Sequence, residues 1–179
     1  MRVIAGVARG IPLAAPRDRA TRPITDRVKE TLFAILGERI LDARVLDLYA
    51  GSGAIGIEAL SRGASFATFV ERGRTAVAVL RQNLERTKLG ERAEIHESDV
   101  MRFLNGAEQG RWDLVALDPP YDERAILAPL ARLVPVLPQG ATVVVKHFWR
   151  SPPPDVAGLR RWRERRFGET ALTFLERAF

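Results

Sequence analysis

The sequence contains no cysteine and only two histidines, His96 and His147, among its 179 residues. The absence of cysteine excludes disulfides, thiolate zinc sites, iron–sulfur clusters and a cysteine nucleophile. Two histidines are too few for a histidine-rich metal site, so we expect no bound metal. No apolar run approaches the roughly 18–20 residues of a membrane helix, and arginine and proline interrupt the N-terminus too early for a signal peptide. We therefore expect a soluble cytoplasmic protein.

Lysine is also scarce, with three residues against 25 arginines, although the net charge is +6. The excess positive charge lies at the two ends of the chain. Residues 1–40 carry a net +4, residues 41–150 are neutral and residues 151–179 carry +2. Arginine suits bidentate phosphate contacts and stacking on bases. Charge alone leaves two interpretations open, a nucleic-acid partner or a compositional bias of the chain.

The length and a hydrophobic content of 46% favour one globular domain. Apolar runs alternate with helical periodicities, which predicts an α/β fold with a mostly parallel sheet and helices on both faces. The expected strands are 45–49, 65–70, 93–96, 112–117 and 141–145, followed by a hairpin of 159–167 and 170–176. The expected helices are 26–40, 54–61, 75–89 and 123–134. Residues 1–26 are interpreted as a basic arm or hairpin ahead of a domain formed by residues 27–179.

A glycine-rich loop follows the first expected strand. Residues 51–56 fit the pattern G-x-G-x-x-G, and Glu71 lies twenty residues after Gly51, at the end of the next strand. Glycine lets the backbone approach a ligand closely, and the Glu71 carboxylate can accept hydrogen bonds from both ribose hydroxyls. Both a dinucleotide and S-adenosylmethionine fit this pattern. Asp47 favours the second, because a carboxylate repels a pyrophosphate but attracts a sulfonium and an ammonium group.

Two further acidic positions follow later strands. Asp99 is either an acceptor for an adenine amino group or a cap of a turn or helix. Asp118-Pro119-Pro120-Tyr121 directly follows the fourth expected strand. The prolines hold the backbone extended, so that the Asp118 carboxylate and the Pro119 carbonyl point in fixed directions as acceptors. With Tyr121 as a stacking surface, this group suits a planar substrate with an exocyclic amino group, although a plain strand-terminating turn is the alternative.

These motifs resemble the S-adenosylmethionine-dependent amino methyltransferases of nucleic acid, and more narrowly the bacterial small-subunit ribosomal RNA guanine-N2 methyltransferases. The resemblance covers nearly the whole chain and is carried by residues 21–33, 45–54, 58–64, 118–121 and 167–172. It implies a Rossmann-like class I methyltransferase fold with a seven-stranded sheet. The sequence departs from the family pattern at Ile24, Ala34, Glu169 and Lys146; Lys146 ends the fifth strand where an acidic residue is expected, and its role stays open.

The resemblance also implies a reaction and a set of site residues. The reaction transfers a methyl group from S-adenosylmethionine to the N2 amino group of a guanine in 16S ribosomal RNA, leaving S-adenosylhomocysteine. The implied catalytic residues are Asp118, Pro119, Pro120 and Tyr121. The implied cofactor-binding residues are Asp47, Tyr49, Ala50, Gly51, Ser52, Gly53, Glu71, Arg72, Asp99, Val100 and Asp118. The expected RNA-binding residues are Arg2, Arg9, Arg17, Arg22, Thr25 and Arg27. We expect a monomer that acts on 16S ribosomal RNA or on an assembling small subunit.

Three other functions remain open at this point. A nicotinamide-dependent oxidoreductase would use the same glycine loop, but the sequence offers no convincing proton donor. A non-enzymatic RNA-binding module would not need the intact acidic positions. An adenine-N6 methyltransferase shares the Asp-Pro-Pro-Tyr motif, but 179 residues leave no room for a separate DNA-recognition domain. The arginine cluster at residues 160–166, with Trp162, is interpreted as a solvated hairpin, with a second RNA-binding patch as the alternative.

Overall fold

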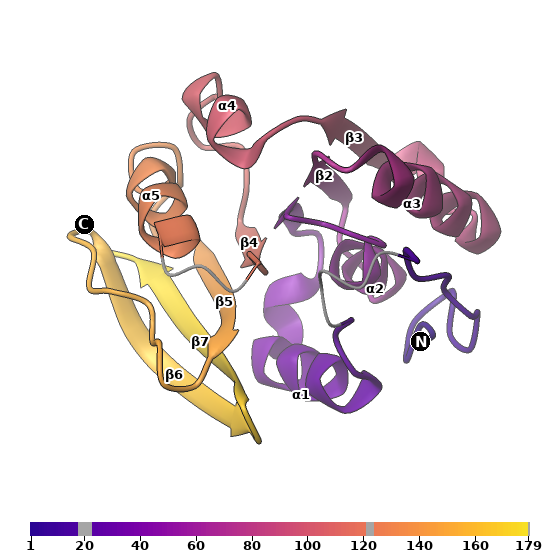
Figure 1. Ribbon diagram of the computed structural model, residues 1–179, viewed down its shortest axis with the longest axis horizontal. Coiled ribbons are helices and arrows are strands. Elements are labelled where there is room, and N and C mark those ends of the chain that lie inside the picture. The colour runs from indigo at the N-terminus through magenta and orange to yellow at the C-terminus, as the bar shows by residue number, and fades with distance from the viewer. Residues whose placement is uncertain (18–22, 121–123, 179) are drawn as a thin grey trace.

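The computed structural model describes residues 1–17, 23–120 and 124–178 and centres on a seven-stranded sheet of order β3-β2-β1-β4-β5-β7-β6 (Figure 1). The strands are β1 (Arg44–Leu48), β2 (Phe66–Glu71), β3 (Ala93–Glu97), β4 (Leu114–Leu117), β5 (Thr142–Phe148), β6 (Leu159–Phe167) and β7 (Thr170–Arg177). Strands β1 to β5 pair in parallel, whereas β7 pairs antiparallel with both β5 and β6. The α/β class, the mostly parallel sheet and the C-terminal hairpin are therefore confirmed.

Five α-helices lie among the described residues. They are α1 (Asp26–Leu36), α2 (Ala54–Ser61), α3 (Arg74–Thr87), α4 (Val100–Asn105) and α5 (Arg124–Leu133), with 3₁₀ turns η1 (Gly37–Ile40) and η2 (Gly90–Arg92). The sequence did not predict α4, which has only six residues and so cannot show a helical periodicity. Within the described residues, none of the helices is both long enough and apolar enough to span a membrane.

The first helix differs slightly from its prediction. Its N-cap is Thr25, whose hydroxyl accepts a hydrogen bond from the Val28 backbone N–H, and Asp26 is the first helical residue. The helix ends at Leu36 because Gly37 adopts a φ of +53°, and the chain continues as a 3₁₀ turn. The Thr25 cap therefore fixes where α1 begins, directly after the N-terminal segment.

The strands divide the core between the two faces of the sheet. Alternate residues of a strand point to opposite faces, so Val45 packs in the cluster that contains residues of α1, α2 and α3. Its neighbour Leu46 packs in the cluster that contains residues of α4 and α5. This arrangement leaves the carboxyl ends of the parallel strands uncovered, which is where ligands bind in such sheets.

The N-terminal segment is docked on the body of the protein and does not extend away from it. Val3, Ala8 and Leu13 are buried, and Val3 donates its backbone N–H to the Ile11 carbonyl at 3.0 Å in a tight reversal of the chain. An isolated antiparallel bridge joins Arg2 to Pro12. These contacts make the first thirteen residues a hairpin-like cap on the helical face.

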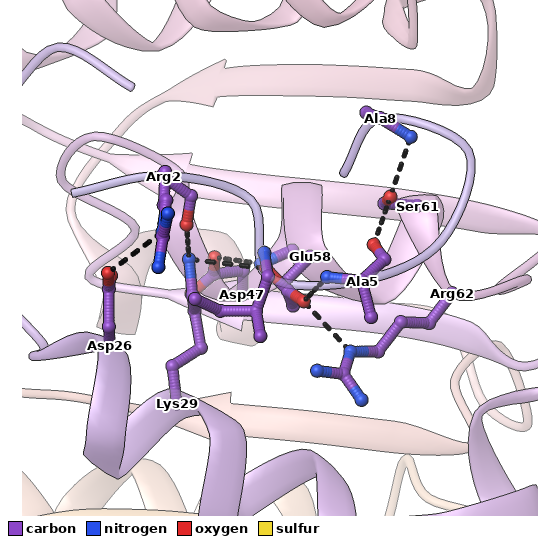
Figure 2. Close-up of polar contacts among 11 residues, drawn as sticks. Arg2, Ala5, Ala8, Asp26, Lys29, Asp47, Glu58, Ser61 and Arg62 are labelled. Atoms are coloured by element: carbon purple, nitrogen blue, oxygen red, sulfur yellow. Dashed lines mark hydrogen bonds and ion pairs between the residues drawn. The ribbon is translucent and has the colours of Figure 1, made fainter. Parts of the chain in front are cut away.

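A fully buried carboxylate on α2 holds this segment in place (Figure 2). Glu58 accepts hydrogen bonds from the Ile4 and Ala5 backbone N–H groups at 2.9 and 3.1 Å. It also pairs with the fully buried ammonium of Lys29 on α1 at 3.2 Å and with Arg62 at 2.8 Å. Because a buried charge is costly unless paired and hydrogen-bonded, this cluster ties α1, α2 and the N-terminal segment into one unit.

Candidate active site

A cavity of about 550 Å³ lies at the carboxyl ends of the parallel strands, a size typical of small-molecule sites. The expected site residues that line it are Asp47, Tyr49, Ala50, Gly51, Ser52, Glu71, Arg72, Asp99, Asp118 and Pro120. They lie at or just after the carboxyl ends of four different strands, β1, β2, β3 and β4, and the fold brings them to one edge of the sheet.

Three expected residues contribute from behind the cavity wall. Gly53 is the N-cap of α2 with a φ of +79°, and a Cβ there would lie 2.1 Å from a Leu80 methyl group, so only glycine fits. The side chain of Val100 is buried in the α4 and α5 cluster. Pro119 is buried and does not line the cavity, whereas the next residue, Pro120, is exposed and does. Tyr121 and Arg22 lie outside the described residues.

Asp47 lies at the base of the glycine loop and is 2% exposed. Its Oδ2 accepts a hydrogen bond from the Gly56 backbone N–H at 2.9 Å, near the start of α2 (Figure 2). Within the described part of the chain, no basic side chain pairs with Asp47. Burial therefore raises the pKa of this carboxyl to about 8, with the nearby charges of Asp118 and Glu71 adding to the rise. Asp47 is thus a buried acid that no positively charged side chain of the described residues neutralises.

Glu71 organises the loop and also faces the cavity. Its Oε2 accepts from the Gly51 N–H at 2.9 Å, and its Oε1 accepts from the Gly73 N–H at 2.7 Å. The φ of Gly51 is +56°, a conformation that favours glycine and lets its N–H turn toward this carboxylate. Because each carboxylate oxygen has a second lone pair, Glu71 can hold the loop and still accept hydrogen bonds from a bound ligand.

Asp118 lines the same cavity from the position directly after β4, and its charge acts on Asp47. Its Oδ1 pairs with the Lys146 ammonium at 2.8 Å, and the two side chains are 24% and 11% exposed. Burial raises the pKa of Asp118, and Lys146 opposes that rise both by its charge and by its hydrogen bond. Lys146, at which the sequence departs from the family pattern, thus contacts the expected catalytic carboxylate of Asp118. The β4–β5 register, which pairs Leu117 with Val145, places the two residues side by side.

Asp99 has a structural contact as well as a place in the cavity. It is the N-cap of α4, and its Oδ1 accepts from the Arg102 N–H at 3.1 Å. The helix-cap interpretation of this residue is therefore confirmed. Its position on the cavity wall leaves the second carboxylate oxygen available to a ligand.

The cavity has a wall that the sequence did not predict. The N-terminal segment supplies it through Ala15, Pro16, Pro23 and Ile24. Asn83 of α3, which is fully buried, links this wall to the glycine loop. Its amide exchanges two hydrogen bonds with the Ala14 backbone at 2.8 and 2.9 Å and donates to the Ser52 carbonyl at 2.9 Å. A buried amide on an otherwise amphipathic helix was the one sequence signal that could have indicated this link.

The expected RNA-binding residues lie around the N-terminal segment in different environments. The side chains of Arg9, Arg17 and Arg27 are exposed. Arg2 faces Asp26 at 3.5 Å and its carbonyl accepts from Lys29. Thr25 uses its hydroxyl to cap α1. Arg2 and Thr25 therefore make contacts that stabilise the fold.

Comparisons with known proteins agree with this arrangement. The family model described as conserved hypothetical protein 95 matches residues 1–176. YlbH of Bacillus subtilis is 35% identical over 182 residues, which cover 99% of each chain. Ribosomal RNA small subunit methyltransferase D of Escherichia coli is 45% identical over 122 residues, covering 68% of this chain and 60% of that protein. The solved structure of yhhF from Escherichia coli superposes with a TM-score of 0.89 at 35% identity, covering 99% of this chain and 98% of that one.

Proposed function

The chain belongs to the family of conserved hypothetical protein 95, and from this premise we propose that it is an S-adenosylmethionine-dependent methyltransferase that acts on the N2 amino group of a guanine in 16S ribosomal RNA. The name of the Escherichia coli relative, a small-subunit ribosomal RNA methyltransferase, supports the reaction and the kind of RNA. The choice of guanine N2 rests on the resemblance of residues 22–28 to the ribosomal RNA guanine-N2 enzymes, because the Asp-Pro-Pro-Tyr motif is shared with adenine-N6 enzymes.

The observation that carries the proposal is the meeting of three carboxylates in one cavity, from Asp47, Glu71 and Asp118. A pyrophosphate would be repelled by such a set, which argues against a dinucleotide. S-adenosylmethionine carries a cationic sulfur, an ammonium group and a ribose, and it supplies the methyl group. The residues present fit it, because Asp47 is a buried acid that lacks a positive partner among the described residues.

Each part of the cavity then has a task. Asp47 and the loop at residues 49–53 would hold the amino-acid end of the cofactor, and Glu71 would accept from the ribose hydroxyls. Asp99 and the backbone of Val100 would face the adenine. Arg72, which lines the cavity beside Glu71, would flank the nucleoside.

The transfer end of the cavity supports attack by an exocyclic amine. A guanine amino group is a poor nucleophile, because its lone pair is delocalised into the ring. Asp118 and the Pro119 carbonyl would each accept one amino hydrogen, which favours a nitrogen that becomes tetrahedral and positively charged. The nitrogen forms its bond to the methyl carbon as the sulfur–carbon bond breaks, and Asp118 accepts the released proton. Positioning the amine can supply several of the ~7–11 kcal/mol available from orientation.

The exposed arginines of the N-terminal segment are proposed as RNA contacts. Arg9, Arg17 and Arg27 are exposed, and the segment that carries them also lines the cavity through Ala15 and Pro16. RNA bound there would reach the cavity mouth. The target base must be unpaired or turned out of its helix to enter, because a stacked base hides its amino group.

The test is a methyl-transfer assay with purified protein, radiolabelled S-adenosylmethionine and unmodified 16S ribosomal RNA, as free RNA and as assembled small subunits. Nucleoside mass spectrometry of the product is expected to show N2-methylguanosine. Appearance of N6-methyladenosine instead would show that the protein is an adenine-N6 methyltransferase and would overturn the assignment to guanine N2. Tight calorimetric binding of NADH with no binding of S-adenosylhomocysteine would overturn it.

A further inference from the structure

Strand β6 forms the outer edge of the sheet, far along the chain from the N-terminal segment (Figure 1). Its nine residues include five arginines and one acid. We use the name β6 surface for the outer edge formed by Arg163, Arg165 and Arg166 on this strand together with Trp149 and Arg150, which follow β5. Because alternate residues of a strand point to opposite faces, Arg163 and Arg165 lie on one face of this edge, and Arg166, which stacks on Trp149, lies on the other. None of these residues lines the cavity, so the cofactor site does not explain them.

The strand register connects this surface to the catalytic end of the cavity. Arg165 lies opposite Leu172 of β7, and Leu172 lies opposite Lys146 of β5. Residues directly opposite each other in an antiparallel pair project from the same face. Lys146 in turn contacts Asp118. With a strand spacing of about 4.8 Å, the backbone of Arg165 lies about 10 Å from that of Lys146, in one row that starts at the catalytic carboxylate.

Two arginines of this surface have side chains without a partner among the described residues. Arg163 and Arg165 are exposed, and neither guanidinium makes a hydrogen bond or ion pair with any residue that the structure describes. Other arginines of the strand are neutralised, since Arg160 pairs with Glu176 at 3.0 Å and Arg161 lies 3.5 Å from Glu164. The unpaired charges are therefore concentrated on the part of β6 that lies level with Lys146 and with the cavity.

The hairpin tip carries a stack of flat groups. The Arg166 guanidinium lies 3.6 Å from the centre of the Trp149 ring, and the Arg150 guanidinium lies 4.8 Å from it. The Trp149 backbone N–H donates to the Glu169 carbonyl at 2.9 Å, which fixes this residue against the hairpin turn. Unpaired RNA bases stack on aromatic rings and on guanidinium planes, so this tip is already arranged as a stacking surface.

Charged residues on an edge strand also prevent sheets from pairing edge to edge, and that function would explain the charge by itself. It does not explain the unpaired arginines level with Lys146 or the stacked tip. Trp162, by contrast, packs on Phe174 with ring centres 5.4 Å apart and belongs to the core. The sequence favoured a solvated hairpin for this cluster, and the geometry favours the alternative.

We propose that the β6 surface binds the ribosomal RNA strand that flanks the target nucleotide, with phosphates on Arg163 and Arg165 and a neighbouring base on the Trp149 tip. This inference rests on the proposed function, because it takes the position of the target base beside Asp118 as its starting point. The RNA then spans the cavity mouth, between the N-terminal segment on one side and the β6 surface on the other.

The test compares two double variants of equal charge. Arg163→Gln/Arg165→Gln removes the unpaired charges of β6. The control, Arg81→Gln/Lys88→Gln, removes two exposed charges on and just after α3, at the other side of the sheet. The probe is a 16S ribosomal RNA transcript, measured by filter binding over a range of salt concentrations and by methyl transfer. Loss of two phosphate contacts is expected to lower the salt slope of binding by about 1.4–1.8.

The β6 variant is expected to raise the KM for RNA at least tenfold, with kcat and the affinity for S-adenosylhomocysteine unchanged, whereas the control stays within twofold of wild type. An additional Trp149→Ala variant is expected to weaken RNA binding without a change in salt slope, because it removes stacking and not charge. Equal KM values and equal salt slopes in the β6 and control variants would overturn the inference. If wild-type protein binds the transcript but transfers no methyl group, the proposed function fails, and the filter-binding comparison still decides the role of the surface.

Discussion

The cofactor end and the transfer end of the cavity each hold a carboxylate, the buried Asp47 and the partly exposed Asp118, but the protein treats the two charges differently. At the cofactor end, Asp47 has a backbone N–H as its partner and a pKa of about 8. At the transfer end, Asp118 has the Lys146 ammonium at 2.8 Å, which opposes the rise in its pKa. The cofactor end leaves the positive charge to be supplied by the ligand, and the transfer end carries its own.

This difference matches the charges of the two molecules that would meet in the cavity. S-adenosylmethionine carries an ammonium group and a sulfonium. Asp47, which has no cationic partner among the described residues, would therefore form a favourable charge interaction when the ligand binds. A guanine amino group is neutral and becomes positive only during transfer. A carboxylate whose negative charge is favoured by a neighbouring lysine can stabilise that positive charge as it develops.

The largest effect that this comparison predicts is at Asp118. Replacing it with alanine removes the acceptor for the amino hydrogens and for the released proton, so we expect kcat to fall by more than about 10³-fold. Binding of S-adenosylhomocysteine, measured by calorimetry, is expected to stay within roughly tenfold, or about 1.4 kcal/mol. A variant with wild-type turnover would remove Asp118 from the reaction.

At the cofactor end, Asp47→Asn is expected to separate binding from stability. Asparagine can still accept from the Gly56 N–H, but it cannot pair with an ammonium group, so the cofactor affinity should fall roughly 100-fold, as for loss of a charge-assisted hydrogen bond. Because the pKa of Asp47 is about 8 in the folded protein and near 4 in the unfolded chain, the unfolded chain loses this proton first as the pH rises. Asp47 therefore lowers the free energy of unfolding increasingly from pH 4 to pH 8. The ligand-free variant should therefore melt at least ~2 °C higher at pH 8. A lower melting temperature together with full affinity would contradict this role.

The same carboxyl predicts a pH dependence of cofactor binding. With a pKa of about 8 in the free protein, Asp47 must lose a proton when a cation binds, so the affinity should rise about tenfold from pH 6 to pH 7. The rise should stop near pH 8, where Asp47 is ionised and an α-amino group begins to lose its own charge. Calorimetry in two buffers of different ionisation enthalpy would measure the released proton. The Asp47→Asn variant should release none, and equal release by both proteins would assign the proton to another group.

Much of this site could be predicted from short stretches of sequence. Glu71 and Asp118 each follow an apolar run that predicts a strand, Asp47 lies near the end of another, and parallel strands bring their carboxyl ends to one edge. The glycine loop was equally visible, because its φ angles demand glycine at fixed spacing. These features depend on neighbours within a few residues, which is the range over which a sequence pattern carries structural information.

The remainder depends on contacts between distant residues. Asn83 meets Ala14 across 69 positions of the chain, and nothing local marks either residue as a partner of the other. The N-terminal wall of the cavity follows from the docking of that segment on Glu58, which no periodicity encodes. The short helix α4 has too few residues for a pattern, so Asp99 could not be assigned as its cap with certainty from the sequence.

Lys146 gives the smallest and most specific test of the comparison. Its distance from Asp118 depends on the register between β4 and β5, so the sequence could mark it as unusual but could not place it. Lys146→Met is expected to raise the pKa of Asp118 further, because the charge and hydrogen bond that oppose its burial are removed. We expect kcat to fall about tenfold at pH 7, comparable to loss of one charge-assisted hydrogen bond.

The acid limb of the kcat/KM profile of this variant should move to higher pH, so that activity recovers partly in alkaline buffer. Lys146→Arg keeps the charge and should restore most of the activity at pH 7, while binding of S-adenosylhomocysteine should be the same in all three proteins. A purely structural role would lower activity by the same factor at every pH and would leave the profile in place. A profile that moves shows that the transfer end carries its own cation for chemistry, and that the contrast with Asp47 is functional.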